Sequence, residues 1–146
     1  MKDLEAAKQY LNNRKMTLII VKKGKLIFET SSHGILGFLK AVKQLREKIE
    51  GASIADRLAG KAVALLCSYA KVKAIYAEIL SEKAKLVLDE TGVHYEYGEI
   101  VENILDVNKT GICPFERVAL EISDPGEAFL ALTSFYQVFL NRVNKK

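Results

Sequence analysis

The chain has 146 residues, of which 49% are hydrophobic and 27% are charged, and its formal net charge is +4. A chain of this size buries roughly two-thirds of its unfolded surface, so the composition fits one soluble globular domain and excludes a disordered or fibrous protein. No apolar run approaches the roughly 20 residues of a membrane span, and the acidic first stretch lacks the apolar segment of a signal peptide. We therefore expect a cytoplasmic protein without membrane contact.

The first predicted elements are a helix and a hairpin. Leu4, Ala7 and Leu11 are spaced for one face of a short helix. Residues 16–30 form two β-rich runs on either side of Gly24, which can take a positive φ in a tight turn. This pattern is typical of a β-hairpin.

Two helices of different character are predicted next. Residues 35–49 repeat apolar side chains with the 3.6-residue period of an amphipathic helix. In residues 53–70 the polar side chains Asp56, Arg57 and Lys61 fall in the first two turns of a predicted helix that is otherwise apolar nearly all round. A helix of this kind should be buried on most sides.

Strands and helices alternate in the rest of the chain. Residues 72–79 predict a buried strand, residues 81–92 a helix with Ser81 as its N-cap, and residues 93–97 an alternating strand. Residues 99–108 favour a helical turn or two.

The chain ends in two further predicted helices. A helix of about nine residues follows Cys113, the sequence Ser-Asp-Pro-Gly breaks it, and a last amphipathic helix covers residues 127–141. With no repeat or linker, residues 1–146 predict a single α/β domain in which helices cover both faces of a mixed sheet.

Cysteine and lysine usage exclude further classes. Cys67 and Cys113 are too few for a disulfide framework, and without Cys-x-x-Cys the chain has neither a thioredoxin motif nor a four-cysteine zinc site. The lysines are scattered rather than interleaved with aromatic residues, so we expect a solvated surface and no nucleic-acid partner. Abundant lysine and few glutamines are compatible with a thermophilic source.

The stretch Thr-Gly-Ile-Cys-Pro-Phe-Glu, residues 110–116, holds a candidate site. Pro114 suits the first helical position and Glu116 that of a capping-box acid, which places Cys113 at or beside the N-cap. Unpaired N–H groups and the positive end of the helix dipole would lower the pKa of a thiol there and would equally bind an anion. The alternative is an ordinary helix start with a small residue and a cap.

A second candidate lies in Ser-Ile-Ala-Asp-Arg-Leu-Ala-Gly-Lys, residues 53–61. Ser53 with Asp56 three residues later is nearly a capping box, which gives Asp56 a purely structural alternative. Lys61 stands on an otherwise apolar helix, and Gly60 leaves room beside it. Together they would line one opening, with Asp56 as general base or ligand contact and Lys61 as electrophile or phosphate contact.

The two histidines complete the candidates. Ser32 and His33 lie in a polar loop with a glycine, which would present N–H groups to an anionic ligand. His94 and Glu96 form His-x-Glu, half of a zinc-deaminase signature, but the signature belongs at a helix start and these residues lie in a predicted strand. We therefore expect no metal at His94, and we assign Cys67 to core packing.

Four features occur together in this chain: the hairpin, the stretch Ala-Asp-Arg-Leu-Ala-Gly-Lys-Ala-Val-Ala-Leu-Leu, the β-α-β pattern and the stretch Thr-Gly-Ile-Cys-Pro-Phe-Glu. In this combination the chain resembles an uncharacterised prokaryotic family. That family has a cytidine-deaminase-like fold and is classed as a domain of unknown function. The resemblance runs from about Thr17 to Phe135 and depends on the paired motifs A-D-x-x-x-G-K-A and G-I-C-P-x-E. It implies a three-layer α/β/α domain, a mixed sheet of about four to five strands that starts with the hairpin, and two helix starts that face one pocket.

The resemblance does not extend to the zinc site. Zinc deaminases place H/C-x-E at the first helix start and P-C-x-x-C at the second. Here the first motif is missing, and Glu116 stands where the second cysteine of the later motif is required. One thiolate with the carboxylates of Asp56 and Glu116 makes a poor tetrahedral zinc site, so we expect neither a metal nor another cofactor.

These motifs favour a deaminase-fold domain that binds a small nucleotide-like or other anionic ligand. Lys61 and the helix start at Cys113 would hold the anion, while Asp56 and Glu116 would fix polar groups or move a proton. The sequence leaves open whether the chain is an enzyme; if it is, Cys113 is the nucleophile of a reaction without zinc. The alternatives are a non-catalytic ligand-sensing or assembly module and an RNA or single-strand binding protein, and analogy with deaminase folds suggests a homodimer.

Overall fold

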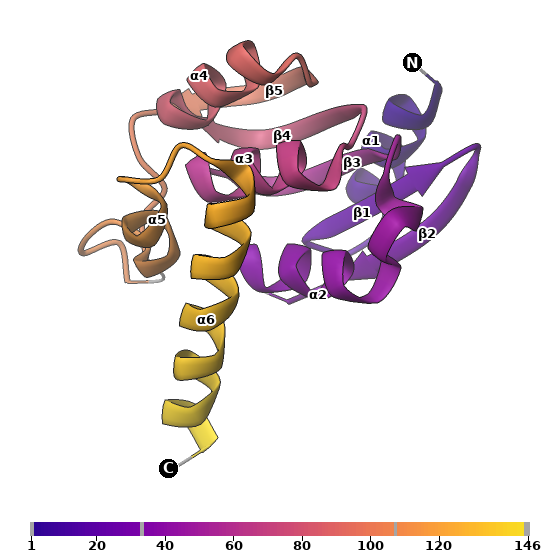
Figure 1. The fold of residues 1–146 in the computed structure, drawn as a ribbon. Coiled ribbons are helices and arrows are strands. Elements are labelled where there is room, and N and C mark those ends of the chain that lie inside the picture. The colour runs from indigo at the N-terminus through magenta and orange to yellow at the C-terminus, as the bar shows by residue number, and fades with distance from the viewer. Residues whose placement is uncertain (1, 33, 107, 145–146) are drawn as a thin grey trace.

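The computed structural model describes residues 2–32, 34–106 and 108–144 and contains a five-stranded mixed sheet (Figure 1). The strands lie in the order β2-β1-β3-β4-β5; β1 is antiparallel to β2 and β3, whereas β3, β4 and β5 run parallel. Their bounds are Leu18–Lys22 for β1, Lys25–Thr30 for β2, Ser53–Ala59 for β3, Ala74–Ser81 for β4 and His94–Val101 for β5. The predicted mixed sheet that starts with a hairpin is confirmed.

Helices cover both faces of this sheet. α1 packs on one face; α2, α3 and α4 pack on the other, and α5 and α6 contact α3. Their bounds are Lys2–Asn13 for α1, Ile35–Leu45 for α2, Lys61–Ala70 for α3, Glu82–Thr91 for α4, Pro114–Ala119 for α5 and Pro125–Asn144 for α6, and a 3₁₀ turn, η1, covers Arg46–Ile49. This is the predicted three-layer α/β/α arrangement. Among the described residues, no helix combines the length and the hydropathy needed to cross a membrane.

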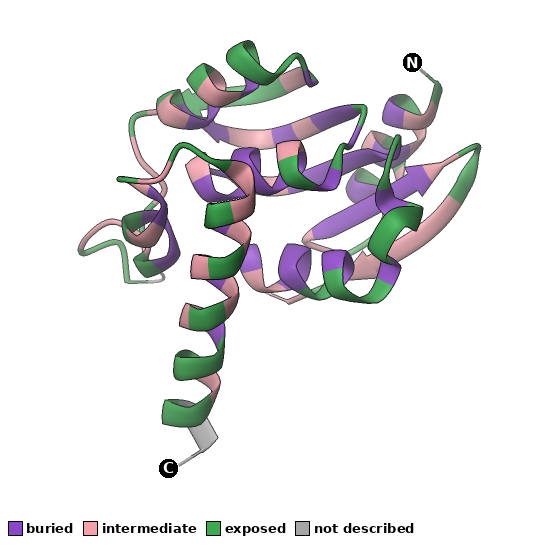
Figure 2. Ribbon diagram, in the orientation of Figure 1, coloured by how far each residue is buried: buried purple, intermediate pink, exposed green. Residues whose placement is uncertain are grey.

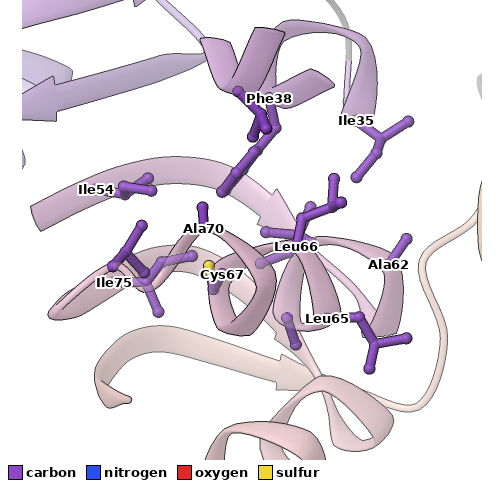
Figure 3. Close-up of a cluster of buried hydrophobic side chains, with 14 of the residues drawn as sticks. Ile35, Phe38, Ile54, Ala62, Leu65, Leu66, Cys67, Ala70 and Ile75 are labelled. Atoms are coloured by element: carbon purple, nitrogen blue, oxygen red, sulfur yellow. The ribbon is translucent and has the colours of Figure 1, made fainter. Parts of the chain in front are cut away.

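Two hydrophobic clusters hold the layers together. Under α1, Leu11 packs in a cluster with Ile19 and Ala55 of the sheet. The larger cluster lies on the opposite face, where Phe38 of α2 and Leu66 of α3 approach the strands (Figure 3). α3 is buried on nearly every side, since the sheet lies on one side of it and α5 and α6 on the other (Figure 2). Its apolar character all round is thereby explained.

Two predicted caps and turns are confirmed. Lys23 and Gly24 form the hairpin turn with φ values of 51° and 76°, and both backbone N–H groups donate to the carboxylate of Asp3 at 2.9 Å. Ser81 caps α4, because its hydroxyl oxygen accepts a hydrogen bond from the backbone N–H of Ala84 at 3.1 Å.

Residues 53–60 do not form the predicted start of a helix. Ser53–Ala59 is strand β3, and α3 begins only at Lys61. Because side chains alternate along a strand, Asp56 lies on the same face as Ile54 and the larger core, whereas Arg57 reaches α1. The capping-box interpretation of Asp56 is therefore wrong. The sequence of this strand, Ser-Ile-Ala-Asp-Arg-Leu-Ala, does not alternate strictly between polar and apolar residues, so its periodicity does not distinguish a strand from the start of a helix.

Three boundaries near the C-terminus also differ from the prediction. Residues 99–101 continue β5 instead of starting a helical turn, because β5 is an edge strand whose exposed positions hide the two-residue period. α5 has six residues rather than about nine, and α6 covers Pro125–Asn144 rather than 127–141.

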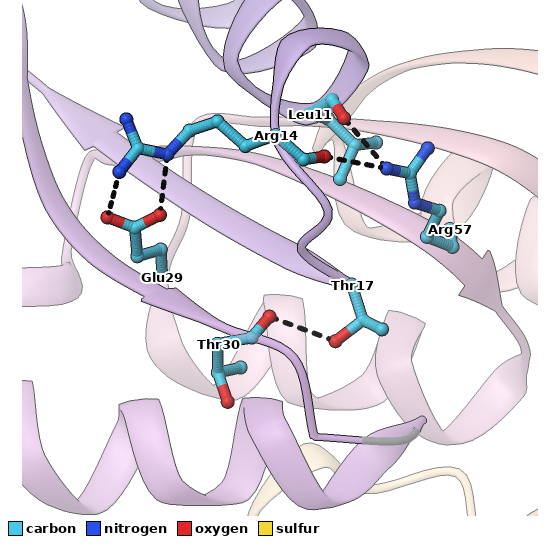
Figure 4. Close-up of polar contacts among 6 residues, drawn as sticks. All are labelled: Leu11, Arg14, Thr17, Glu29, Thr30 and Arg57. Carbon is cyan, nitrogen blue, oxygen red and sulfur yellow. Dashed lines mark hydrogen bonds and ion pairs between the residues drawn. The ribbon is translucent and has the colours of Figure 1, made fainter.

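Arg57 of β3 links α1 to the sheet through hydrogen bonds (Figure 4). Its Nη2 donates to the carbonyl oxygens of Leu11 at 2.7 Å and Arg14 at 3.2 Å, and its Nε donates to that of Met16 at 2.9 Å. Its Nη1 pairs with Oε1 of Glu78 at 2.6 Å. A guanidinium group at the end of α1 satisfies carbonyl groups that the helix leaves unpaired. Arg57 is thus a structural residue of β3, on the face of the strand opposite Asp56.

Candidate functional site

α3 and α5 are joined at their ends. α5 begins at Pro114, with Cys113 as its N-cap, and its residue Glu116 reaches across to the start of α3. Oε1 of Glu116 accepts a hydrogen bond from the backbone N–H of Lys61 at 2.7 Å, and Oε2 accepts one from that of Ala62 at 2.8 Å. Glu116 therefore caps α3, and not its own helix as the capping-box spacing predicts.

A second contact joins the same helices, and in this one the side chain comes from α3 and the backbone group from the end of α5. Nζ of Lys61 donates to the carbonyl oxygen of Leu120, directly after the last residue of α5, at 2.8 Å. An acid thus lies at the positive end of α3 and an ammonium group at the negative end of α5. Each satisfies backbone groups that a helix end leaves unpaired. We call this set the α3–α5 clamp; it consists of Gly60, Lys61, Ala62, Glu116 and Leu120.

Gly60 makes room for the carboxylate. A β-carbon added at this position would overlap the carboxylate group of Glu116. The φ of Gly60 is −105°, which other residues adopt without strain, so the requirement is for space and not for backbone freedom. The room predicted beside Lys61 is therefore filled by Glu116.

Glu116 is held as a buried acid. It is 7% exposed, and burial raises the pKa of its carboxyl group. The N–H groups of Ala62 and Lys61 act in the opposite direction, because they stabilise the charged form. The charge is compensated mainly by the end of α3 itself.

Cys113 lies at the predicted N-cap, but its thiol does not have the predicted character. The side chain is partly buried, and burial raises the pKa of the thiol even though the N–H groups of Glu116 and Phe115 oppose this effect. α5 has only six residues, so its dipole does little to lower the pKa of the thiol. The expectation of a lowered thiol pKa at this helix start is wrong, and the thiol is protonated at neutral pH.

Asp56 is buried in β3, apart from the clamp. It is 3% exposed; its Oδ1 accepts from the backbone N–H of Leu58 at 3.3 Å, and its Oδ2 has no hydrogen-bond partner within the described residues. Burial raises the pKa of Asp56 to about 7. Burial, and to a lesser degree the charge of Asp56, also raises the pKa of the Cys67 thiol in α3. Asp56 therefore belongs to the core, next to Cys67.

Ser32 is held by hydrogen bonds to Thr30 and to residues of the segments beside its loop. Its carbonyl oxygen accepts from Oγ1 of Thr17 at 2.6 Å, and its hydroxyl oxygen accepts from Nζ of Lys40 at 3.2 Å and from Oγ1 of Thr30 at 3.1 Å. His33 lies outside the described residues. In residues 2–32, 34–106 and 108–144 no hydrogen bond joins Ser32 to the α3–α5 clamp.

Two surface depressions of the described structure lie away from the clamp. The first, of about 290 Å³, is lined by Lys22, Lys23, Lys25, Ile27, Leu45 and Lys48. The second, of about 240 Å³, is lined by Lys2, Asp3, Ser53 and Lys73. No residue of the clamp lines either of these two depressions.

The residues at the two helix starts do not fit zinc. Zn²⁺ prefers thiolate and imidazole ligands, whereas an ammonium group, Lys61, stands at the start of α3, and both oxygens of Glu116 are bonded to N–H groups. No three His, Cys, Asp or Glu side chains gather as metal ligands in the part of the chain that the structure describes. His94 lies in β5, as predicted, with its Nε2 3.3 Å from Oε2 of Glu96.

Two partners in the clamp carry no sequence signal. Ala62 and Leu120 contribute only backbone groups, which no side-chain motif marks. An acid at the third position of a helix looks the same whether it caps that helix or its neighbour. The one sequence signal for this contact is Gly60, the N-cap residue of α3. Glycine has no side chain that could accept from the first N–H groups of the helix, so the capping group has to come from elsewhere in the chain.

We expect Glu116→Gln to lower the free energy of unfolding by roughly 1–3 kcal/mol, because an amide oxygen accepts from one N–H group and the amide nitrogen then faces the other. Urea denaturation followed by circular dichroism at pH 7 measures the change. Glu121→Gln is the matched control, since Glu121 is exposed and lies just beyond α5. Equal effects of the two substitutions would contradict the clamp.

The Asp56 carboxyl group should make stability fall with rising pH. Its pKa is about 7 in the fold against 3.8 ordinarily, so between these values the folded state binds more protons than the unfolded one. This group then lowers the free energy of unfolding by up to roughly 1.4 kcal/mol for each pH unit in that window. We expect the difference between Asp56→Asn and wild type, measured by urea denaturation, to grow from pH 4 to pH 8 in favour of Asp56→Asn. A difference that does not change with pH would show that folding does not raise the pKa of Asp56.

Three solved structures are similar to this chain to different degrees. A DUF1893 family protein from Thermotoga maritima has a crystal structure similar to this one, with a TM-score of 0.84 and 27% sequence identity over 91% of this chain and 89% of that chain. RibD from Acinetobacter baumannii is similar over 66% of this chain and 33% of its own, with a TM-score of 0.45 and 22% identity. A dCMP deaminase from the cyanophage S-TIM5 is similar over 68% of this chain and 94% of its own, with a TM-score of 0.47 and 16% identity.

Sequence comparison confirms the predicted membership of a family of unknown function. No curated protein sequence matches the chain significantly. The profile described as Domain of unknown function (DUF1893) matches residues 6–136. This match covers most of the chain, and the protein therefore belongs to the DUF1893 family.

Proposed function

We propose that this DUF1893 protein is a non-catalytic binding module on a deaminase-like fold. The α3–α5 clamp carries the proposal: Glu116 accepts from the N–H groups of Lys61 and Ala62, and Lys61 donates to the carbonyl oxygen of Leu120. Two of the side chains that the motifs suggest for catalysis, Lys61 and Glu116, thus hold two helices together. They line neither of the two depressions described above.

The remaining candidates support the same proposal. A cysteine nucleophile needs a substantial thiolate fraction, and burial raises the pKa of the Cys113 thiol. Asp56 has a pKa suited to proton transfer at neutral pH, but a general base has to come within hydrogen-bond reach of the substrate. A carboxyl group that is 3% exposed and lies in the core has no such access.

A second function, the sensing of a small anion, is favoured by the way α3 begins. Two consecutive backbone N–H groups hold a carboxylate there at 2.7 and 2.8 Å, which is how helix N-termini bind phosphate and carboxylate ligands. A nucleotide-like or other anionic ligand would compete with Glu116 for these groups. Binding of this ligand would break the contact of Glu116 with α3 and release α5. The movement of α5 would then signal that the ligand is bound.

Alkylation kinetics test the non-catalytic proposal. We expect iodoacetamide to modify Cys113 at pH 7.5 at least roughly threefold more slowly than free cysteine, with a rate that is still rising at pH 9, because the raised pKa keeps most of the thiol protonated up to that pH. Mass spectrometry of the modified chain measures the rate, and Cys113→Ser gives the background from buried Cys67. A rate that is already at its plateau near pH 7 would reveal a thiolate and overturn the proposal.

Phosphate rescue tests the anion-sensing function. Glu116→Ala leaves two N–H groups of α3 unpaired and should lower the free energy of unfolding by roughly 1–3 kcal/mol. We expect inorganic phosphate to restore part of this loss in thermal unfolding, and chloride at equal ionic strength to restore none. Glu121→Ala is the matched control and should show no phosphate effect. If phosphate and chloride act alike on Glu116→Ala, the start of α3 does not bind free anions, and the non-catalytic proposal stands without that function.

A further inference from the structure

The outer face of α6 exposes large apolar side chains. α6 buries Ala128, Leu132 and Tyr136 against the rest of the domain. On the other side of the helix, Leu130 is 68% exposed and Val138 is 48% exposed, and Leu130 is the most exposed large hydrophobic residue of the described chain. Figure 1 shows that the C-terminal half of α6 extends beyond the body of the domain, and Figure 2 shows exposed residues along its whole length.

The residues of this face are symmetric about Ser134. Leu130 lies four residues before Ser134 and Val138 four residues after it, so the three form one stripe along the helix. If two copies of α6 cross in antiparallel orientation at Ser134, Leu130 of each copy faces Val138 of the other. The small Ser134 side chains meet at the centre, where they let the two backbones approach closely.

The charges at the ends of the stripe fit the same arrangement. Glu127 lies in the first turn of α6 and Arg142 in the last, and both are exposed. In an antiparallel pair Glu127 of each copy approaches Arg142 of the other, and the opposite ends of the two helix dipoles lie side by side. A parallel pair would bring like charges together.

We propose that this stripe, Glu127, Leu130, Ser134, Val138 and Arg142, is an interface on which two copies of the chain form a twofold-symmetric antiparallel dimer. A second copy is the occupant because the stripe is complementary to itself in apolar side chains and in charge, as a twofold contact requires. The body of each domain lies on the other side of α6, so the two bodies flank the helix pair. The interface does not involve the α3–α5 clamp and is independent of the function proposed for it.

The expected dimer is weak. α6 has 20 residues and is about 30 Å long, so the contact is small and we expect a dissociation constant of roughly 1–100 µM. Sedimentation equilibrium of the full chain between about 1 µM and about 1 mM should show the mass rising from 16.3 kDa towards twice that value. A chain that stays monomeric over this range would overturn the proposal.

Substitutions on the stripe test its location. Leu130→Glu should weaken the dimer by roughly a hundredfold or more, because each dimer then loses two apolar contacts. Leu86→Glu is the matched control: Leu86 is a 64% exposed leucine on α4, away from the stripe, and its substitution should leave the dissociation constant unchanged. Circular dichroism checks that both variants fold. A dimer that tolerates Leu130→Glu as well as the control would refute this interface.

Charge exchange and cross-linking test the orientation. Glu127→Arg or Arg142→Glu alone should weaken the dimer by roughly three- to tenfold, whereas an equimolar mixture of the two variants should associate as tightly as wild type. Ser134→Cys should form an intermolecular disulfide under mild oxidation, because the two side chains meet at the twofold axis, and exposed Ser123→Cys should not. An uncompensated charge exchange, or equal cross-linking of the two cysteine variants, would exclude the antiparallel pair.

Discussion

Reciprocal capping of α3 and α5 determines how the C-terminal third of the chain sits on the sheet. The acid of one helix satisfies the N–H groups of the other, and the ammonium group of the second satisfies a carbonyl group of the first. α6 follows α5 directly and packs against it; Phe115 and Phe135 meet edge to face with ring centroids 4.8 Å apart. The polar contacts act together with the packing of α6 directly on α3, where the rings of Tyr69 and Phe129 stack with centroids 4.4 Å apart.

A carboxylate that joins two helices has a different chemical role from a metal ion that joins them. In zinc deaminases two helix starts supply the ligands of a metal ion, which activates a water. In this chain the groups that converge are the N–H groups of α3 and the carboxylate of Glu116, so the convergence is an internal ion–dipole contact. Gly60 fits this internal contact, because its missing side chain leaves space for the carboxylate of Glu116 and it offers no side chain that could bind a metal.

Local patterns predicted much of this fold, and the failures have physical causes. The hairpin turn at Lys23 and Gly24, the cap at Ser81 and the N-cap position of Cys113 all depend on neighbouring residues, and all were predictable. The strand containing Asp56 was not, because its burial on both faces removes the two-residue period that distinguishes a strand from a helix.

The candidate site was predictable only as a list of residues. Lys61 and Glu116 do meet, as the paired motifs imply, but their roles follow from partners that are 54 to 59 residues away and that contribute backbone atoms. The pKa of the Cys113 thiol likewise depends on how much of the chain covers it, which spacing does not reveal. Asp56 and Ser32 are each held by contacts in their own part of the sheet.

The long sequence separation within the clamp has a kinetic consequence. We expect contacts that span this much chain to form late, after the sheet and α3 have formed, because closing so large a loop is entropically costly until other contacts hold it. Until α5 arrives, the first amide protons of α3 have no acceptor. Hydrogen exchange at Lys61 and Ala62 should consequently report the detachment of one small cooperative unit, α5 with its flanking loops, at a free energy below that of global unfolding.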